Sequence, residues 1–274
     1  MNITFLGSAA SEGIPFPYCK CTTCEHARKF KGKNVRKRCS YLINDNLLID
    51  IGPDLFTACE QHNVELTKVT SILVTHSHLD HFNVQNLTVR EQHFHKNTEI
   101  PKVNFVAGPS AMTLLSQSGV SDNVMNLLRV PILPFETIKV PNYHIKSIKA
   151  THLPEIGDAM NYIISDGKNK ILLASDTGIY HEEVWKHLAN EMIDVVIIEA
   201  TKGLFPSNDN HLNVKDINNV IEKLYQIKAI KKTANIYATH FGHQHCPPHS
   251  ELNKILNEYN MHCVYDGLIV NVNK

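Results

Sequence analysis

The stretch Thr75-His76-Ser77-His78-Leu79-Asp80-His81 decides how the rest of this chain is interpreted. It places three imidazoles and one carboxylate within six residues, and these are common ligands of first-row metals. A preceding apolar run predicts a buried strand, and His76 and His78 lie two residues apart, so an extended backbone points both rings to one side. Asp80 and His81 follow where the chain is expected to turn into a helix, so they can face a second point close by. The stretch therefore predicts two adjacent metal sites.

The composition of the chain excludes several classes of protein. Its 274 residues, 43% hydrophobic and 20% charged, suffice for one sizeable core and are typical of a globular protein. Lys and Arg number 27, as do Asp and Glu, so the net charge does not favour binding to nucleic acid or membrane. No apolar run approaches the roughly 20 residues of a spanning helix, and the first residues lack the features of a signal peptide. Seven cysteines, three of them clustered, favour a metal site in a reducing compartment, so we expect a cytoplasmic protein.

Strands and helices are expected to alternate through both halves of the chain. Asn44-Asp45-Asn46 and Asp166-Gly167 are hairpin signals between apolar strands. Helices are expected at residues 54–62, 84–94, 111–117, 181–189, 214–227 and 250–258, and one last strand at 263–271. This order predicts two mixed sheets packed together with helices outside, in a single domain that spans residues 1–274.

Three further ligand candidates share one kind of position, the carboxyl end of an expected strand. They are His152, Asp176 and His240. Neighbouring strand ends converge on one edge of a sheet, where open α/β sheets place their ligand sites. A single histidine at a strand end is more often a packed or an exposed side chain. Because all three follow the His-rich motif of residues 75–81 in the sequence, however, together they indicate a single metal-binding cluster.

This ordered pattern resembles the metallo-β-lactamase superfamily over nearly the whole chain. The resemblance implies a hydrolase with a four-layer αββα sandwich, of the α+β or α/β class. It implies that one divalent metal is held by His76, His78 and His152. It implies that a second is held by Asp80, His81 and His240, and that Asp176 bridges the two. The nitrogen and oxygen ligands fit Zn, Mn or Fe.

The chemistry of such a pair is hydrolytic. Two metals roughly 3.5–4 Å apart can share a hydroxide, because metal binding lowers the pKa of water to about 7. That hydroxide would be the nucleophile, and the metals would stabilise charge that develops on the substrate oxygens. The superfamily does not determine which bond is cut, since its branches hydrolyse phosphodiesters, thioesters and lactams.

A second set of ligands lies near the start of the chain, at about residues 15–40. Three thiols lie within six residues: Cys19, Cys21 and Cys24. A closed structural zinc site uses Cys₄ or Cys₃His, so a fourth ligand is needed, and the segment that follows His240 offers His243, His245 and Cys246. We favour His243 and keep the other two as alternatives. This set, the cysteine clip, would hold the N-terminal excursion beside the metal cluster, although free thiols or a redox switch are other interpretations.

The clip narrows the resemblance to one branch of the superfamily. Together with Arg38-Cys39-Ser40, the motif Thr-His-x-x-His and Tyr265-Asp266-Gly267, it resembles the phosphoribosyl cyclic phosphodiesterases of the carbon–phosphorus lyase pathway. That resemblance implies a structural zinc on the three cysteines and His243. It also implies that Glu199 and His211 assist catalysis, although Glu199 stands where that branch has Asp.

The two catalytic candidates also have a physical rationale. His211, on a polar loop, could protonate a departing alkoxide as a general acid. Glu199 could orient its ring or raise its pKa. The alternatives are a loop histidine without a role and a carboxylate that caps a helix or binds a lysine. We count Asp80 with these two as a catalytic residue.

The leading functional hypothesis is a dinuclear, metal-dependent phosphodiesterase that acts on a small phosphate ester, cyclic esters included. Residues 28–38 hold seven Lys or Arg and no acid, so they form either a solvated loop or a basic rim for such an anion. One alternative is an RNA-processing endonuclease of the tRNase Z type, which shares the ligand motif but usually carries a Gly/Pro-rich arm not found here. Others are a non-hydrolytic protein like the B protein of the pyrroloquinoline-quinone pathway, and a thioesterase. The resemblance also implies a homodimer.

Overall fold

The computed structural model describes residues 1–153 and 155–272, and two seven-stranded sheets form its centre. The first sheet contains, in spatial order, β14 (Ile269–Asn271), β1 (Asn2–Gly7), β2 (Ser40–Ile43), β3 (Leu47–Ile49), β4 (Ser71–Leu73), β5 (Val103–Ala107) and β6 (Leu127–Pro131). Strands β14 to β3 pair antiparallel, and β3 to β6 pair parallel. The sheet is therefore mixed, as expected.

The second sheet repeats this mixed arrangement. It contains, in spatial order, β13 (Met261–Cys263), β12 (Ile230–Thr239), β11 (Ile193–Glu199), β10 (Lys170–Ala174), β9 (Met160–Ser165), β8 (Tyr143–Lys149) and β7 (Thr137–Val140). Strands β10 to β13 pair parallel, and β7 to β10 pair antiparallel. The carboxyl ends of β8, β10, β11 and β12 each lead into a loop that carries a candidate site residue.

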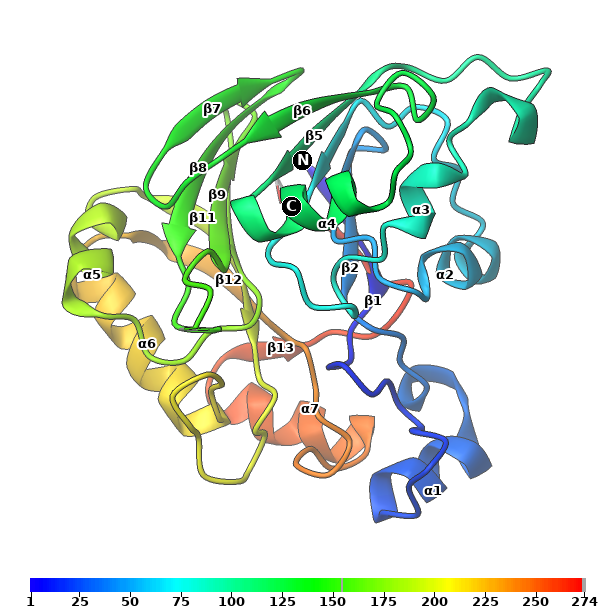
Figure 1. Ribbon diagram of the computed structural model, residues 1–274. Coiled ribbons are helices and arrows are strands. Elements are labelled where there is room, and N and C mark those ends of the chain that lie inside the picture. Colours follow the sequence, from blue (N-terminus) through cyan, green and yellow to red (C-terminus); the bar gives the residue numbers. More distant parts are fainter. Residues whose placement is uncertain (154, 273–274) are drawn as a thin grey trace.

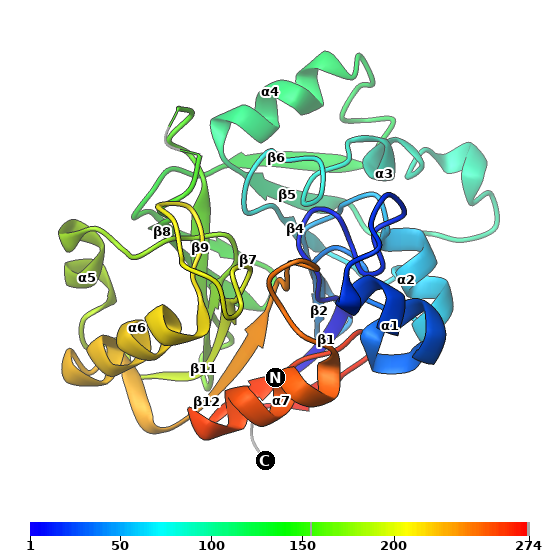
Figure 2. The ribbon, with the colours of Figure 1, turned by 90° about the horizontal axis from the view of Figure 1, so that it is seen from below.

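Helices cover the outer face of each sheet, which completes the four-layer αββα sandwich (Figures 1 and 2). The first sheet is covered by α2 (Leu55–His62), α3 (Gln85–Thr88) and α4 (Pro109–Gln117), with the short 3₁₀ helix η2 (Gln92–Phe94) beyond them. The second is covered by α5 (Glu182–Leu188), α6 (Val214–Gln226) and α7 (His249–Glu258). No helix in the described residues is long and apolar enough to cross a membrane.

Alternation along the strands separates two apolar clusters. In β3, Leu47 and Ile49 join the large cluster between the sheets, whereas Leu48 joins the cluster under α2 to α4. Successive side chains of a strand point to opposite faces, so one short segment supplies both layers. The central strands of the second sheet are apolar on both faces, because helices cover one side and the other sheet covers the second.

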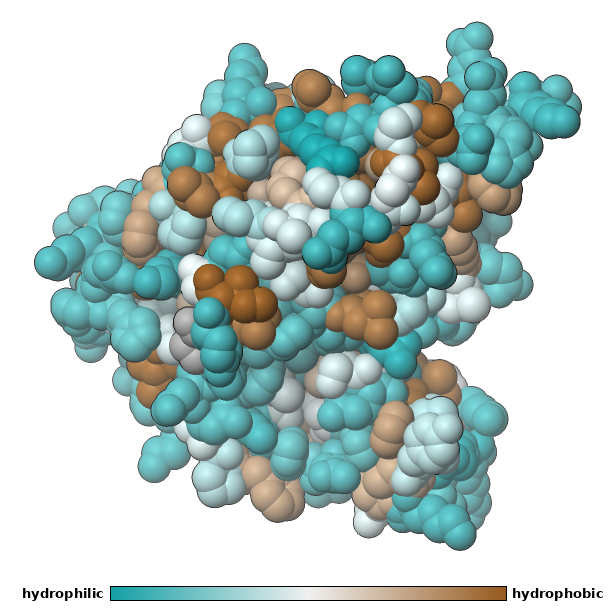
Figure 3. Space-filling model, in the orientation of Figure 1, coloured by the Kyte–Doolittle hydropathy of each residue, from teal (hydrophilic) through white to brown (hydrophobic). Residues whose placement is uncertain are grey.

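A small lobe beside the sandwich holds α1 (Thr22–Phe30) and the 3₁₀ helix η1 (Gly32–Asn34). In Figure 3 this lobe stands apart at the lower right, with a notch between it and the body. The basic residues 28–38 are thus not one mobile loop. Arg36 is buried, donating to Ser8 Oγ at 2.7 Å, and Arg38 pairs with Asp54 at 2.9 Å. Part of the expected basic rim is therefore structural.

Two expected elements are wrong. Residues 84–94 are not one helix, because α3 ends at Thr88 and His95 Nε2 lies 2.8 Å from the Arg90 carbonyl oxygen. That contact takes the acceptor that a continuing helix would use. Residues 263–271 are not one strand either. They contain the end of β13 and all of β14, which belong to different sheets, and Gly267 turns the chain between them at φ +85°.

Candidate metal centre

Seven side chains from four strand ends meet at one edge of the sandwich. They are His76, His78, Asp80 and His81 after β4, His152 after β8, Asp176 after β10, and His240 after β12. They form two groups, in each of which the ligand atoms all lie within 4.8 Å of one another. The first group is His76, His78, His152 and Asp176, and the second is Asp80, His81, Asp176 and His240. The structure thus brings together every expected ligand of the pair.

Asp176 belongs to both groups through different oxygens. Its Oδ2 lies 3.7 Å from His152 Nε2 and 3.9 Å from His76 Nε2. Its Oδ1 lies 2.8 Å from His240 Nε2 and 3.3 Å from His81 Nε2. The carboxylate is buried, so each oxygen faces a different set of imidazoles in a low-dielectric site. This is the geometry that a shared ligand requires.

The polar atoms of the cluster suit bound cations. His81 Nε2 and His240 Nε2 are buried, and although Asp176 Oδ1 lies 3.3 and 2.8 Å away, neither atom makes a hydrogen bond of good geometry among the described residues. Buried polar atoms are nearly always paired, and an ion is one explanation of an exception. In the other group, His76 Nε2 lies 2.9 Å from His78 Nδ1, and burial lowers the pKa of His76 well below its ordinary value. A neutral imidazole is the form that binds metal.

Neighbouring groups hold each ring in place from behind. Asp50, fully buried, accepts a hydrogen bond from His81 Nδ1 at 2.7 Å and from the Thr75 backbone N–H at 2.8 Å. The hydroxyl of Thr201 lies 2.8 Å from His240 Nδ1. Such partners fix the ring orientation of a metal ligand and raise its basicity. These contacts direct Nε2 of both rings into the cluster.

The sequence interpretation did not identify Asp50 or Thr201 as part of the site. A signal existed for Asp50, because it also follows an apolar strand, as the ligands do. Asp50, Asp176 and His240 share a left-handed backbone, at φ 57°, 44° and 56°. Such conformations are costly for residues other than glycine and cluster at functional sites. Gly52 allows a close approach nearby, because a Cβ there would lie 1.9 Å from the Asp80 carbonyl oxygen.

Glu199 and His211 form a pair at the rim of the cluster. The Glu199 side chain is fully buried and accepts from the backbone N–H groups of Thr177 and Thr201 at 3.0 and 2.9 Å. Its Oε1 also accepts from His211 Nδ1 at 2.8 Å. Burial would lower the pKa of His211, but the Glu199 carboxylate outweighs it and raises that pKa. The His211 ring centroid lies 5.0 Å from that of His152.

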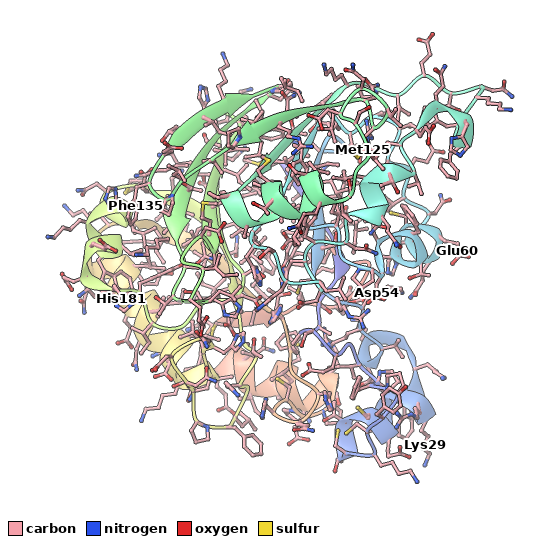
Figure 4. The ribbon with its side chains drawn as sticks, in the orientation of Figure 1. Lys29, Asp54, Glu60, Met125, Phe135 and His181 are labelled. Atoms are coloured by element: carbon pink, nitrogen blue, oxygen red, sulfur yellow. The ribbon has the colours of Figure 1, made fainter. Side chains whose placement is uncertain are left out.

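The cysteine clip is assembled with His243. The Sγ atoms of Cys21 and Cys24 each lie 3.5 Å from His243 Nδ1, and Cys19 Sγ belongs to the same group. Burial and the neighbouring thiols raise the pKa of Cys24 to about 12, so a set of thiolates here requires a cation. In Figure 4, sulfur atoms lie beside Lys29 in the α1 lobe. Neither alternative ligand, His245 or Cys246, joins the group.

A cavity of about 540 Å³ opens beside His152. Its lining includes Lys149, Ile179, His181, Asn208 and Asn210. The backbone carbonyl of Asn210 lies 3.3 Å from His152 Nδ1, so this loop connects the cavity to the ligand cluster. Figure 4 places His181 on the α5 side of the molecule, opposite Asp54. The cavity thus has a mixed polar and apolar lining, adjoins one candidate ligand, and lies on the side of the second sheet.

The sandwich and the His/Asp cluster at its edge define a metallo-β-lactamase-type protein with a divalent metal site. Residues 45–241 match the family model of the beta-lactamase superfamily domain, and the chain belongs to this family. Its members are mostly hydrolases. A comparison with curated proteins found no match.

Several solved structures share this fold. A diphosphatase of the PhnP family is 20% identical, with 98% of this chain and 96% of that one covered at a TM-score of 0.76. Zn²⁺-bound PqqB from Methylobacterium extorquens is 17% identical, with 99% and 100% covered at 0.76. The short form of human tRNase Z is 16% identical, with 99% of each chain covered at 0.65. The fold and the resemblance expected from the sequence are thereby confirmed.

Proposed function

We propose that this protein is a metal-dependent phosphodiesterase that hydrolyses a small phosphate ester, cyclic esters included. The observation that carries the proposal is the position of the Asp176 carboxylate between the two groups. Its Oδ2 faces His152, and its Oδ1 faces His240. A carboxylate shared in this way fits two divalent metals side by side, as in many enzymes that cleave phosphate esters.

We assign one metal to each group of ligands. His76, His78 and His152 would hold the first, Asp80, His81 and His240 would hold the second, and Asp176 would be shared by both. The nitrogen and oxygen donors suit Zn, Mn or Fe, whereas the three cysteines and His243 suit a structural zinc. When bound, the metal pair would supply Lewis acidity and a water of lowered pKa.

His211 is assigned as the general acid. Its Nδ1 is occupied by Glu199, so Nε2 is the nitrogen that can donate. Glu199 raises the pKa of His211, which favours the protonated ring that a general acid needs. That proton would pass from Nε2 to the departing alkoxide oxygen. Glu199 acts through His211 and is a positioning residue, held by its two backbone N–H donors.

The size and the lining of the cavity beside His152 suit a small phosphorylated substrate. The cation of Lys149 and the amides of Asn208 and Asn210 are suited to phosphate and to the hydroxyl groups of a sugar. Because one similar structure is a diphosphatase, phosphoanhydrides belong in the substrate screen with the phosphodiesters.

Other functions make different predictions. An RNA-processing endonuclease would need a polyanion partner, which the neutral net charge does not favour. RNA binding that collapses with added salt would support it. If the protein is fully loaded with metal and hydrolyses none of the esters tested, that result would support the PqqB-like alternative, in which the protein is not a hydrolase. Faster turnover of a glutathione or coenzyme A thioester than of any phosphodiester would support a thioesterase.

The deciding experiment is hydrolysis of bis(p-nitrophenyl) phosphate by protein loaded in turn with Mn and Zn. We expect metal-dependent turnover that is lost in Asp176→Ala. If the protein binds two metals and gives no turnover, the phosphodiesterase proposal fails.

A further inference from the structure

A second cavity, of about 240 Å³, lies on the outer side of the first sheet under α2 and α3. Leu48, Leu55 and Ile72 line it and belong to the apolar cluster beneath these helices, not to the cluster between the sheets. Figure 1 shows α2 and α3 side by side there. An engineered apolar cavity of about 150 Å³ holds benzene, so this one has room for a short apolar molecule.

Arg90 is a cation in this apolar lining without an acidic partner. Its Nη2 donates to the Pro101 carbonyl at 2.8 Å and its Nε to the Met125 carbonyl at 3.3 Å. Among the described residues, no carboxylate lies within ion-pair distance of Arg90. Within the same part of the chain, its Nη1 has no hydrogen-bond partner and is not among the buried unpaired atoms, so this N–H is accessible. Burial lowers the pKa of Arg90 to about 10, so it stays charged at neutral pH. An accessible guanidinium N–H beside an apolar cavity can take the carboxylate of a ligand whose body fills that cavity.

His95 lies next to Arg90 in the lining, and its contacts favour the protonated ring. Its Nε2 lies 2.8 Å from the Arg90 carbonyl oxygen, and its Nδ1 lies 2.9 Å from that of Thr98. A carbonyl only accepts hydrogen bonds, so both ring nitrogens must donate, which only the protonated ring can do. These two contacts raise the pKa of His95.

We propose that this cavity binds a small molecule with an apolar body and one carboxylate, such as a medium-chain acid, with Arg90 as its anchor. The apolar body would fill the space between Leu48, Leu55 and Ile72, and the carboxylate would take the free guanidinium N–H. Charge-assisted bonds to arginine are directional and strong. None of the candidate metal ligands lines this cavity, so this ligand is not the substrate.

The test is calorimetric titration of the wild-type protein with octanoate, 1-octanol and octylammonium, which share a chain and differ in head group. We expect one site that prefers octanoate by about tenfold or more over the other two. Arg90→Gln should reduce that preference to within about threefold, and Arg90→Lys should retain part of it. Arg129→Gln, which removes a surface arginine paired with Asp122 at 2.8 Å, is the matched control and should change nothing.

A second variant separates binding from any folding role of Arg90. Leu66 is half-buried in the lining, and a tryptophan in its place would fill part of the cavity. Leu66→Trp should therefore weaken the binding of octanoate and of 1-octanol equally. Absence of octanoate binding to the wild type overturns the proposal. So does equal affinity for all three probes, which would leave an apolar cavity without selection for an anion.

Discussion

Glu199 Oε1 accepts a hydrogen bond from His211 Nδ1 at 2.8 Å, and this contact makes a loop histidine a candidate acid. The carboxylate is fully buried and receives two backbone N–H groups besides. It therefore cannot turn away from the ring without leaving these donors unpaired. The imidazole is held with its second nitrogen free at the rim of the cluster.

Replacing His211 by Ala should lower kcat on the order of 10²-fold or more for substrates with poor leaving groups. For substrates whose leaving groups depart without a proton, kcat should fall much less, because these leaving groups do not need the general acid. The measurement is kcat for a series of aryl and alkyl phosphodiesters. Equal losses for good and poor leaving groups would contradict the assignment.

Asp176→Ala should abolish turnover, since it removes the oxygen that faces each group of imidazoles. Metal content measured by mass spectrometry should fall below that of the wild type. Asp45→Asn, which alters an exposed turn, is the control and should retain both metal content and rate. A near-normal rate in Asp176→Ala would rule out the bridging role.

Asp50→Asn should weaken metal binding about 10- to 100-fold while the fold persists. The amide keeps the shape of the carboxylate but loses its charge, so it holds the His81 ring less firmly. Competition with a chelator measures the affinity. Asp54→Asn, which breaks only the pair with Arg38, should leave that affinity unchanged. Equal affinities in both variants would remove Asp50 from the site.

The ligand motif and the strand-end positions could be predicted because metal ligands have characteristic residue types and spacings. The residues that hold these ligands in place could not be predicted from the sequence. Asp50 contacts His81 across 31 positions of sequence, and Thr201 contacts His240 across 39. Such contacts depend on how strands pair, which local patterns do not encode. The break after Thr88 is different, because it is local: Glu91 has an extended backbone, and the His95 ring contacts the Arg90 carbonyl five residues back.

Cys21→Ala should lower Tm by about 5–10 °C and leave the metals of the active site in place. The clip closes a long loop between the α1 lobe and His243, and loss of a structural metal site costs folding free energy. Differential scanning calorimetry and metal analysis check the two parts. Cys59→Ala, on α2 away from the clip, should cost less. An unchanged Tm after loss of one zinc would contradict a structural role.

Asp266 should make the protein less stable as the pH rises from about 4 to about 6. Burial raises its pKa from the ordinary 3.8 to about 6, although it accepts hydrogen bonds from Ser8 Oγ and the Lys37 N–H at 2.6 Å each. The folded protein therefore holds this proton more tightly than the unfolded chain does. The contribution of Asp266 to the free energy of unfolding is greatest below its pKa in the unfolded chain. It falls by roughly 3 kcal/mol as the pH rises through its pKa in the folded protein.

Asp266→Asn removes that titration, so its free energy of unfolding should vary less over this range than that of the wild type. Urea denaturation at pH 4, 5, 6 and 7 measures the difference between the two proteins, and it cancels the other groups that titrate. Asp45→Asn, at an exposed turn, is the control and should follow the wild-type curve. If wild type and Asp266→Asn run parallel from pH 4 to 7, the carboxyl at position 266 titrates at the same pH in the folded and unfolded states.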